Sequence, residues 1–217
     1  PTFNESLNID SILRNFIKFY EKKKKYKIII IFIDDGSTDN SVYKIKNFKK
    51  RKISNVKIKL LQHKKNYGLG KALKTGFSYS FNNGEKNDVI VTMDTDSSHT
   101  VNLSFKMLNK IIFNKKDIVI ASRYLKNSKT KGLNNLRIFL SFVASILFRL
   151  FFPIKNVRDY TSGFRAFRIE KIRNEWKKNK SFFSEKGFSA SVDILLKLYK
   201  IRKNIVFFEY PINLRYD

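Results

Sequence analysis

Short, almost wholly apolar runs alternate with longer amphipathic stretches through the first half of the chain. This alternation is typical of βαβ units, in which helices cover both faces of a largely parallel sheet. It predicts an α/β fold with a mostly parallel central sheet flanked by helices. The predicted strands are residues 27–33, 56–62, 88–93 and 117–121, and the predicted helices are residues 6–20, 40–50, 70–81 and 101–113.

The second half begins with an apolar, aromatic-rich stretch, residues 136–152, which ends before Pro153. A membrane-spanning helix needs about 20 apolar residues, so this stretch is too short and too charged to cross a bilayer. We expect an amphipathic helix that either lies in a membrane interface or packs against the core. A predicted helix over residues 190–201 and strands over 204–210 and 212–215 complete a C-terminal extension.

No low-complexity linker divides the chain, and its 217 residues with 42% apolar content suffice for one full core. A single domain over residues 1–217 is therefore expected. The chain begins at Pro1, stops at Asp217 inside a predicted strand and carries no charged-then-apolar leader. We expect both ends to be truncated, and a membrane-spanning segment could follow residue 217.

The chain is strongly basic, with a formal net charge of +27. Such a charge suits nucleic acid, phospholipid headgroups or phosphate substrates, but lysines spread along the whole length also fit a merely solvated surface. The carboxylates gather at the ends of predicted strands, where they would repel nucleic acid phosphates, so no nucleic acid partner is expected. The absence of cysteine excludes disulfides, thiol nucleophiles and thiolate zinc sites, and fits a reducing compartment.

Two aspartates, Asp94 and Asp96, directly follow a predicted apolar strand and are separated by one residue. In extended backbone both carboxylates point to the same side, where they can share a hard divalent cation, Mg²⁺ or Mn²⁺, with substrate phosphates. The alternative is that they cap the helix predicted from Val101. His99 follows closely, and it either lines this site or makes local hydrogen bonds.

Further polar groups lie where ligands bind in open α/β sheets, at the carboxyl ends of strands. Asp34 and Asp35 end one strand and can accept from a base N–H or a ribose hydroxyl, whereas Asp39 or the next residue serves as a helix cap. Gly68 and Gly70 lack the third glycine of a dinucleotide-binding loop. Four arginines stand at element ends and either hold phosphate oxygens or form surface ion pairs, namely Arg123, Arg137, Arg165 and Arg168.

Taken in order, these motifs resemble one family. Pro-Thr-Phe-Asn-Glu at 1–5, Ile-Asp-Asp-Gly-Ser at 33–37, Asn-Tyr-Gly-Leu-Gly at 66–70, Met-Asp-Thr-Asp at 93–96 and Ala-Ser-Arg-Tyr at 121–124 are similar to the family 2 glycosyltransferases of the Rossmann-like GT-A fold. The stretch 158–168 resembles the polyprenyl-phosphate glycosyltransferases, of the dolichol-phosphate mannose synthase type. The resemblance covers essentially the whole chain.

The resemblance implies a nucleotide-sugar donor site and assigns residues to it. Phe3 stands where the family usually has Tyr, and Asp35, more than Asp34, is expected to read the base. The residues implied in holding the donor are Pro1, Thr2, Phe3, Glu5, Asp34, Asp35, Gly68, Lys71, Asp94, Thr95, Asp96 and Arg123. Of these, Asp94, Asp96 and Arg123 are expected to be catalytic.

The resemblance also implies a metal and an acceptor. Asp94 and Asp96 would hold Mg²⁺ or Mn²⁺, with Ser98 where several relatives have a glutamine ligand. Arg137 and Ser141 match positions that approach a polyprenyl-phosphate acceptor. The expected setting is the cytoplasmic face of a membrane, whose surface is then a partner, and the family's basic motif after the last strands would lie beyond Asp217.

An acceptor phosphate is largely ionised near neutrality, its second pKa being about 6, so no general base is required. We expect an inverting transfer of a hexose from GDP-mannose or a UDP-sugar by a single in-line displacement. The alternative within the family is transfer to a glycan or another hydroxyl acceptor, for which Asp193 is the nearest base. Outside this activity, the chain could instead be a basic nucleic-acid-binding protein or an inactive scaffold of the same fold.

Overall fold

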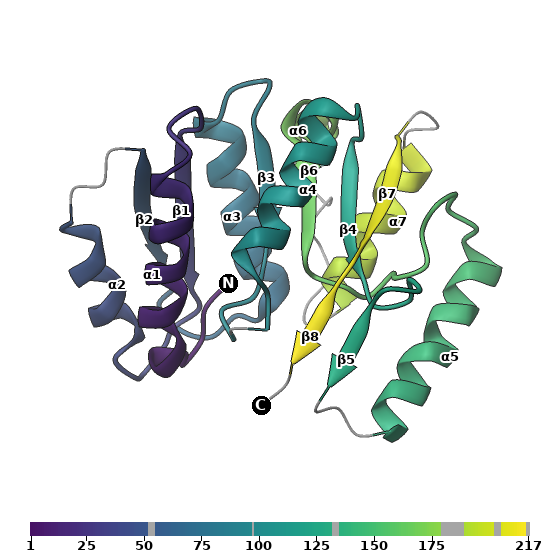
Figure 1. Cartoon of the computed structure of the whole chain (residues 1–217), viewed down its shortest axis with the longest axis horizontal. Helices are drawn as coiled ribbons and strands as arrows, with labels where there is room; N and C mark the ends of the chain where they lie inside the picture. Colours follow the sequence, from purple (N-terminus) through teal and green to yellow (C-terminus); the bar gives the residue numbers. More distant parts are fainter. Residues whose placement is uncertain (52–54, 97, 132–134, 179–188, 202–204, 216–217) are drawn as a thin grey trace.

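The computed structural model describes residues 1–51, 55–96, 98–131, 135–178, 189–201 and 205–215, as shown in Figure 1. Helices and strands alternate through the first half, as the sequence predicts. The helices are α1 (Ser6–Glu21), α2 (Ser41–Lys49), α3 (Leu69–Asn83), α4 (Val101–Phe113), α5 (Asn135–Phe151), α6 (Ile169–Lys178) and α7 (Ser189–Ile201). The strands are β1 (Ile28–Asp34), β2 (Val56–Gln62), β3 (Val89–Thr92), β4 (Ile118–Ser122), β5 (Lys129–Lys131), β6 (Arg165–Arg168), β7 (Phe207–Pro211) and β8 (Asn213–Arg215).

The strands form three hydrogen-bonded groups. The β1-β2 pair lies beside the four-stranded group, and β5 and β8 lie below β4 and β7 in the view of Figure 1. Strands β1 and β2 pair in parallel, in register from Ile28 opposite Val56 to Asp34 opposite Gln62. A four-stranded group follows in the order β3-β6-β4-β7, with β4 and β7 parallel. Strands β5 and β8 form a short parallel pair beyond it.

Three elements depart from the sequence prediction. Strand β6 runs antiparallel between β3 and β4, so the sheet is mixed where the sequence predicted consecutive parallel strands. Its four residues, Arg-Ala-Phe-Arg, form no apolar run, and its place depends on pairing with strands about 50 or more residues away in sequence. The short strand β5 and the helix α6 were likewise not predicted. The start of the strand expected from residue 204 lies outside the described residues.

Strand β4 shows how the layers form, because all five of its residues are buried. Ile118 and Ile120 face the cluster formed by α3, α7 and Phe167. Val119 and Ala121 face the opposite cluster, formed with α4. A helix layer thus covers each face of the sheet, as the continuous apolar strands predict. The layers leave the carboxyl ends of β1, β3 and β4 at one edge, and antiparallel β6 begins there.

Helix α5 lies at the periphery of the molecule, beside β5 (Figure 1). One side of it packs inward through the buried Ser145 and through Phe148, whose ring stacks on Tyr160 at 5.5 Å. Several of its large apolar side chains are exposed, namely Leu140, Phe142, Ile146, Leu147, Leu150 and Phe151. Among the described residues, no helix combines the length and apolar character that crossing a membrane requires.

Candidate active site

A cavity of about 500 Å³ opens at the carboxyl ends of β1, β3 and β4. Ten of the residues predicted to hold the donor line it, namely Pro1, Thr2, Phe3, Glu5, Asp35, Gly68, Asp94, Thr95, Asp96 and Arg123. Sheet edges of this kind collect ligand-binding groups because successive strands end there. The structure therefore brings five separate sequence motifs to one place.

The first residues of the chain continue the sheet beside the end of β1. Thr2 donates from its backbone N to the carbonyl of Ile33 at 2.8 Å, and the N–H of Asp35 donates back to the carbonyl of Thr2 at 2.8 Å. Residues 1–3 therefore have a strand-like partner and enter the cavity in a fixed direction. Thr95 adds a further tie, since its hydroxyl donates to the carbonyl of Pro1 at 3.0 Å.

The loop after β1 caps the start of α1. Backbone amides of the first segment donate to its side chains: Asn4 to Ser37 at 3.0 Å, Glu5 to Ser41 at 2.9 Å and Ser6 to Asp39 at 2.9 Å. Asp39 also accepts from the N–H of Ser41, so it caps α1 and α2 together. Asp39 therefore has the structural role that the sequence predicted. The same set of bonds fixes the backbone of Glu5, whose side chain lines the cavity.

Asp35 lies at the base of the cavity and is held by several donors. Its Oδ1 accepts from the N–H of Tyr67 at 3.1 Å and lies 2.6 Å from Nδ1 of His63, and its Oδ2 accepts from the N–H of Gly68 at 2.7 Å. His63 is itself fixed, since its Nε2 lies 2.9 Å from the hydroxyl of Thr75 on α3. Gly68 has φ +88°, in the region that favours glycine.

Two predicted donor-site residues lie elsewhere. Asp34 is buried and does not line the cavity; its Oδ1 accepts from the N–H of Ser37 at 3.4 Å. Lys71 is exposed on α3, also away from the cavity lining. Of the two adjacent aspartates, Asp35 thus lines the cavity, whereas Asp34 accepts a hydrogen bond within the turn that follows β1.

The segment after β3 places Asp94 and Asp96 in the cavity through its own hydrogen bonds. Nδ1 of His99 accepts from the N–H of Asp94 at 3.0 Å, and the His99 ring stacks on Phe164. Ser98 donates from its hydroxyl at 2.6 Å and from its N–H at 3.0 Å to Oδ1 of Asp96. Ser98 therefore orients a carboxylate and does not line the cavity.

The alternative cap role of these aspartates is settled by Thr100. Its hydroxyl accepts from the N–H of Leu103 at 3.4 Å and caps α4, so Asp94 and Asp96 are not needed there. His99 lines the cavity as well. Burial lowers the pKa of His99, although the charges of Asp94 and Asp96 oppose this shift.

Negative charge accumulates in this part of the cavity. Burial raises the pKa of Glu5 above its ordinary value, a hydrogen bond from Asn8 opposes the shift, and the charges of Asp96, Asp39 and Asp94 add to it. Among the described residues, no three acidic or histidine side chains converge on one point. Two carboxylates still fit Mg²⁺ or Mn²⁺, because such ions usually complete their shell with substrate phosphates and water.

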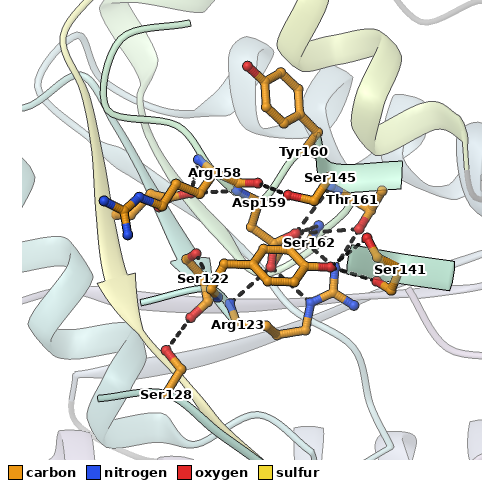
Figure 2. Close-up of polar contacts among 12 residues, drawn as sticks. Ser122, Arg123, Ser128, Ser141, Ser145, Arg158, Asp159, Tyr160, Thr161 and Ser162 are labelled. Carbon is orange, nitrogen blue, oxygen red and sulfur yellow. Dashed lines mark hydrogen bonds and ion pairs between the residues drawn. The ribbon is translucent and has the colours of Figure 1, made fainter. Parts of the chain in front are cut away.

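Arg123 follows β4 and is paired with Asp159 (Figure 2). Its Nε donates to Asp159 Oδ2 at 2.8 Å and its Nη2 to Oδ1 at 2.8 Å, which makes a bidentate pair. Nη2 also donates to the hydroxyl of Thr161. Burial alone would raise the pKa of Asp159, but the hydrogen bonds and charge of Arg123 outweigh it and hold that pKa below its ordinary value.

A second hollow, a groove of about 710 Å³, runs between the segment after β4 and α5. Its lining combines cations with apolar side chains of α5: Arg123, Tyr124, Leu125, Lys126, Phe142, Ile146, Arg149, Leu150 and Arg158. Among the described residues, Arg123 is common to the linings of the cavity and the groove. The two hollows therefore adjoin at this guanidinium.

The two predicted acceptor residues both belong to α5. The hydroxyl of Ser141 lies 2.7 Å from the hydroxyl of Tyr124, which lines the groove. Arg137 falls within the helix, but its side chain lies outside what the structure describes. The remaining arginines serve the fold: Arg165 is buried and donates to the carbonyls of Tyr160 and Ser191, and burial lowers its pKa to about 10. Arg168 donates to the carbonyls of residues 111 and 116.

Several cavity residues had no predicted role. Thr161, Ser162 and Gly163 line it from the loop before β6, and Ser191 lines it from α7. Thr161, Ser162 and Gly163 fall in the stretch 158–168, whose resemblance to the polyprenyl-phosphate subgroup was the available signal; no motif pointed to Ser191. Asp193, the base expected for a hydroxyl acceptor, pairs with Lys197 at 2.6 Å and does not line the cavity.

Comparison with known proteins places the chain in a family. Residues 1–179 match the model of glycosyl transferase family 2. The chain is 28% identical over 198 residues to a dolichol-phosphate mannosyltransferase of Pyrococcus furiosus, covering 91% of this chain and 51% of that protein. It is 33% identical over 183 residues to a UDP-N-acetylglucosamine--dolichyl-phosphate N-acetylglucosaminyltransferase of Methanococcus voltae, covering 77% of this chain and 66% of that protein. The chain thus spans about half and about two thirds of these relatives.

Solved structures agree in fold. A glucosyl-3-phosphoglycerate synthase of Mycobacterium tuberculosis, solved with Mn²⁺, uridine diphosphate and glucosyl-3-phosphoglycerate, matches with a TM-score of 0.62 and 16% identity. The match covers 99% of this chain and 68% of that chain. At this identity the likeness shows the fold alone. The fold and the family model agree, and the chain therefore belongs to glycosyl transferase family 2 and has the GT-A fold.

Proposed function

We propose that this protein transfers a hexose from a nucleotide-sugar donor to a polyprenyl phosphate at a membrane surface. The observation that carries the proposal is the meeting of the acidic cavity and the cation-lined apolar groove at Arg123. The first suits a nucleotide diphosphate with its cation, and the second suits a phosphate attached to an apolar chain. The names of the relatives from Pyrococcus furiosus and Methanococcus voltae support this pairing of substrates.

The donor would lie with its nucleotide against residues 1–3 and Asp35, and with its diphosphate toward Asp94 and Asp96. Those two carboxylates would hold Mg²⁺ or Mn²⁺, which supplies positive charge beside the leaving diphosphate. Ser98 and His99 orient this acidic segment through the hydrogen bonds described above. We include both UDP-sugars and GDP-mannose as donors.

The acceptor phosphate would enter from the groove and contact Arg123. One of its oxygens attacks the anomeric carbon as the bond from that carbon to the donor diphosphate breaks, which inverts the configuration. The attacking oxygen is already ionised, with a second pKa of about 6, so no side chain must remove a proton. The position of Asp193, which pairs with Lys197 outside the cavity, is consistent with this chemistry.

Helix α5 would place the groove at the membrane. Its exposed apolar side chains flank a groove that also carries Lys126, Arg149 and Arg158, a combination suited to anionic lipid headgroups above an acyl layer. A polyprenyl chain could then remain in the bilayer while its phosphate reaches Arg123. We propose the cytoplasmic face of the membrane as the location, because the proposed donors, UDP-sugars and GDP-mannose, would reach the cavity from the cytosol.

Donor binding is tested first, by a thermal-shift panel of UDP-, GDP- and CDP-sugars with and without Mn²⁺. Occupancy at about 100 times Kd stabilises a protein by about 2.7 kcal/mol, which is readily measured. We expect one nucleotide class to raise the melting temperature in a Mn²⁺-dependent way and Asp96→Ala to abolish the shift. The matched control is Asp10→Ala, which removes an aspartate of α1 paired with Lys44 and should keep it.

Acceptor choice is tested next with the donor that binds. Transfer of labelled sugar to a short-chain polyprenyl phosphate is compared with transfer to the corresponding polyprenol. The proposal requires a product with the phosphate and none with the alcohol. Equal transfer to the alcohol, or donor binding that Asp96→Ala leaves intact, would overturn it.

A further inference from the structure

Asp159 is fully buried and lies beside Arg123, to which it is hydrogen-bonded (Figure 2). Its carboxylate accepts from the Nε and Nη2 atoms of Arg123, and Oδ2 also accepts from the backbone N–H of Arg123 at 3.0 Å. Side chain and backbone of the arginine are thus held by one carboxylate. The sequence motifs assigned no role to Asp159.

We propose that Asp159 is a positioning residue that fixes the Arg123 guanidinium at the junction of the cavity and the groove, so that it receives the acceptor phosphate in the orientation needed for attack. This inference rests on the proposed function for the identity of the acceptor. Asp159 itself touches no substrate. Its effect passes through Arg123.

The carboxylate of Asp159 is itself fixed from several sides. Its Oδ1 accepts from the N–H of Ser162 at 3.0 Å. The backbone N–H groups of Arg158 and Asp159 both donate to one oxygen of the buried Glu209, each at 2.6 Å. Glu209 belongs to β7, which pairs directly with β4, the strand that carries Arg123 at its end. We call the paired side chains of Arg123 and Asp159 the clamp; through Glu209 the clamp is anchored to the central sheet.

Such anchoring matters because an arginine side chain has several rotatable bonds. A planar fork that is already oriented loses less entropy when it binds a phosphate than one that must be ordered first. Thr161, which accepts from the same guanidinium, lines the cavity, while Tyr124 lines the groove. Thr161 thus holds Arg123 on the donor side, and on the acceptor side the Tyr124 ring centre lies 5.5 Å from the guanidinium carbon.

Charge and positioning predict opposite results for Asp159→Asn. Removing a negative charge beside a phosphate site should, by charge alone, tighten binding of the acceptor. Losing the orientation of Arg123 should weaken it. Misplacing or loosening a supporting residue of a catalytic site typically costs about 10- to 100-fold. The sign of the change in acceptor KM therefore separates the two explanations.

The experiment measures kcat and acceptor KM with polyprenyl phosphate, together with the Kd of the donor nucleotide, for Asp159→Asn. We expect kcat/KM for the acceptor to fall about 10- to 100-fold, with a raised acceptor KM. The nucleotide Kd should change by a smaller factor, because Arg123 is one of many residues that line the donor cavity. The matched control is Asp117→Asn. Asp117 is also buried and pairs with Arg168 at 3.5 Å, but it precedes the opposite end of β4 and lines neither hollow.

A second variant, Arg123→Lys, keeps the charge but cannot form the bidentate pair. It should reproduce the loss, and adding Asp159→Asn to it should cause little further loss, because both changes remove the same arrangement. Losses that multiply independently, or a lower KM in Asp159→Asn, would overturn the proposal. If Asp159→Asn does not fold, wild-type kcat/KM in Arg123→Lys overturns it instead.

One measurement does not depend on the reaction. The Nε–H proton of Arg123, observed by NMR with labelled arginine and assigned through Arg123→Lys, should exchange slowly with solvent. Fast exchange in the wild-type protein contradicts the clamp whatever the acceptor is. Slow exchange in a protein that does not act on polyprenyl phosphate contradicts the proposed function and leaves the clamp supported.

Discussion

Gly36 is the position where a single methyl group tests how the loops beside the donor cavity are held. Its φ is +80°, and a Cβ there would lie 2.4 Å from the carbonyl carbon of Lys65 and 2.7 Å from the amide nitrogen of Asn66. Both atoms are backbone, so the loop after β2 would have to move. We expect Gly36→Ala to lower the free energy of unfolding by about 2–5 kcal/mol, combining a left-handed backbone cost of about 1–2 with an overlap of about 1–3.

The assay is urea denaturation, with Gly76→Ala as the matched control. Gly76 lies inside α3, where an added Cβ would meet Ile33 at 3.4 Å, so alanine should be neutral or stabilise by up to about 1 kcal/mol. Because the displaced loop also carries the amides that bind Asp35, Gly36→Ala should weaken nucleotide binding as well. Equal stability of the two variants would refute the reasoning.

Three further outcomes are expected. Thr100→Ala should lower the free energy of unfolding by about 1 kcal/mol in the same denaturation assay, because α4 loses its cap. Leu150→Glu, at a side chain that is 71% exposed on α5, should reduce binding to anionic lipid vesicles about 10-fold or more without lowering the melting temperature, whereas Leu7→Glu, at a residue 90% exposed on α1, should not. Asp193→Asn should keep most turnover, since its carboxylate pairs with a lysine of its own helix; abolished turnover would favour a hydroxyl acceptor.

The sequence predicted correctly those helices and strands that a local hydrophobic pattern distinguishes. Strand β2 was predicted with its observed bounds, and helix α4 likewise, because a short run rich in apolar residues and 3.6-residue spacing are local signals. Strand β6 could not be found this way, since its position depends on distant pairing partners. Helix α6 could have been, because Ile169, Ile172 and Trp176 follow helical spacing.

Of the candidate site, the sequence predicted the residues that belong to motifs but not those that act through distant contacts. Motif order placed Asp94 and Asp96 at the end of β3, and the structure brings them to the cavity with Glu5 and Asp35. The role of Asp159 was not predictable, since a buried carboxylate that orients an arginine 36 residues away leaves no spacing signal. Nor does the sequence reveal which side chains of α5 are exposed, because that depends on what packs beside it.

The proposed function depends on Asp94 and Asp96 binding the diphosphate of an activated sugar through a divalent cation. The most direct measurement is a crystal structure of the protein with Mn²⁺ and the nucleotide sugar that gives the largest thermal shift. We expect one Mn²⁺ ion coordinated by these carboxylates and by the donor diphosphate, inside the cavity. A diphosphate bound away from both aspartates would contradict it.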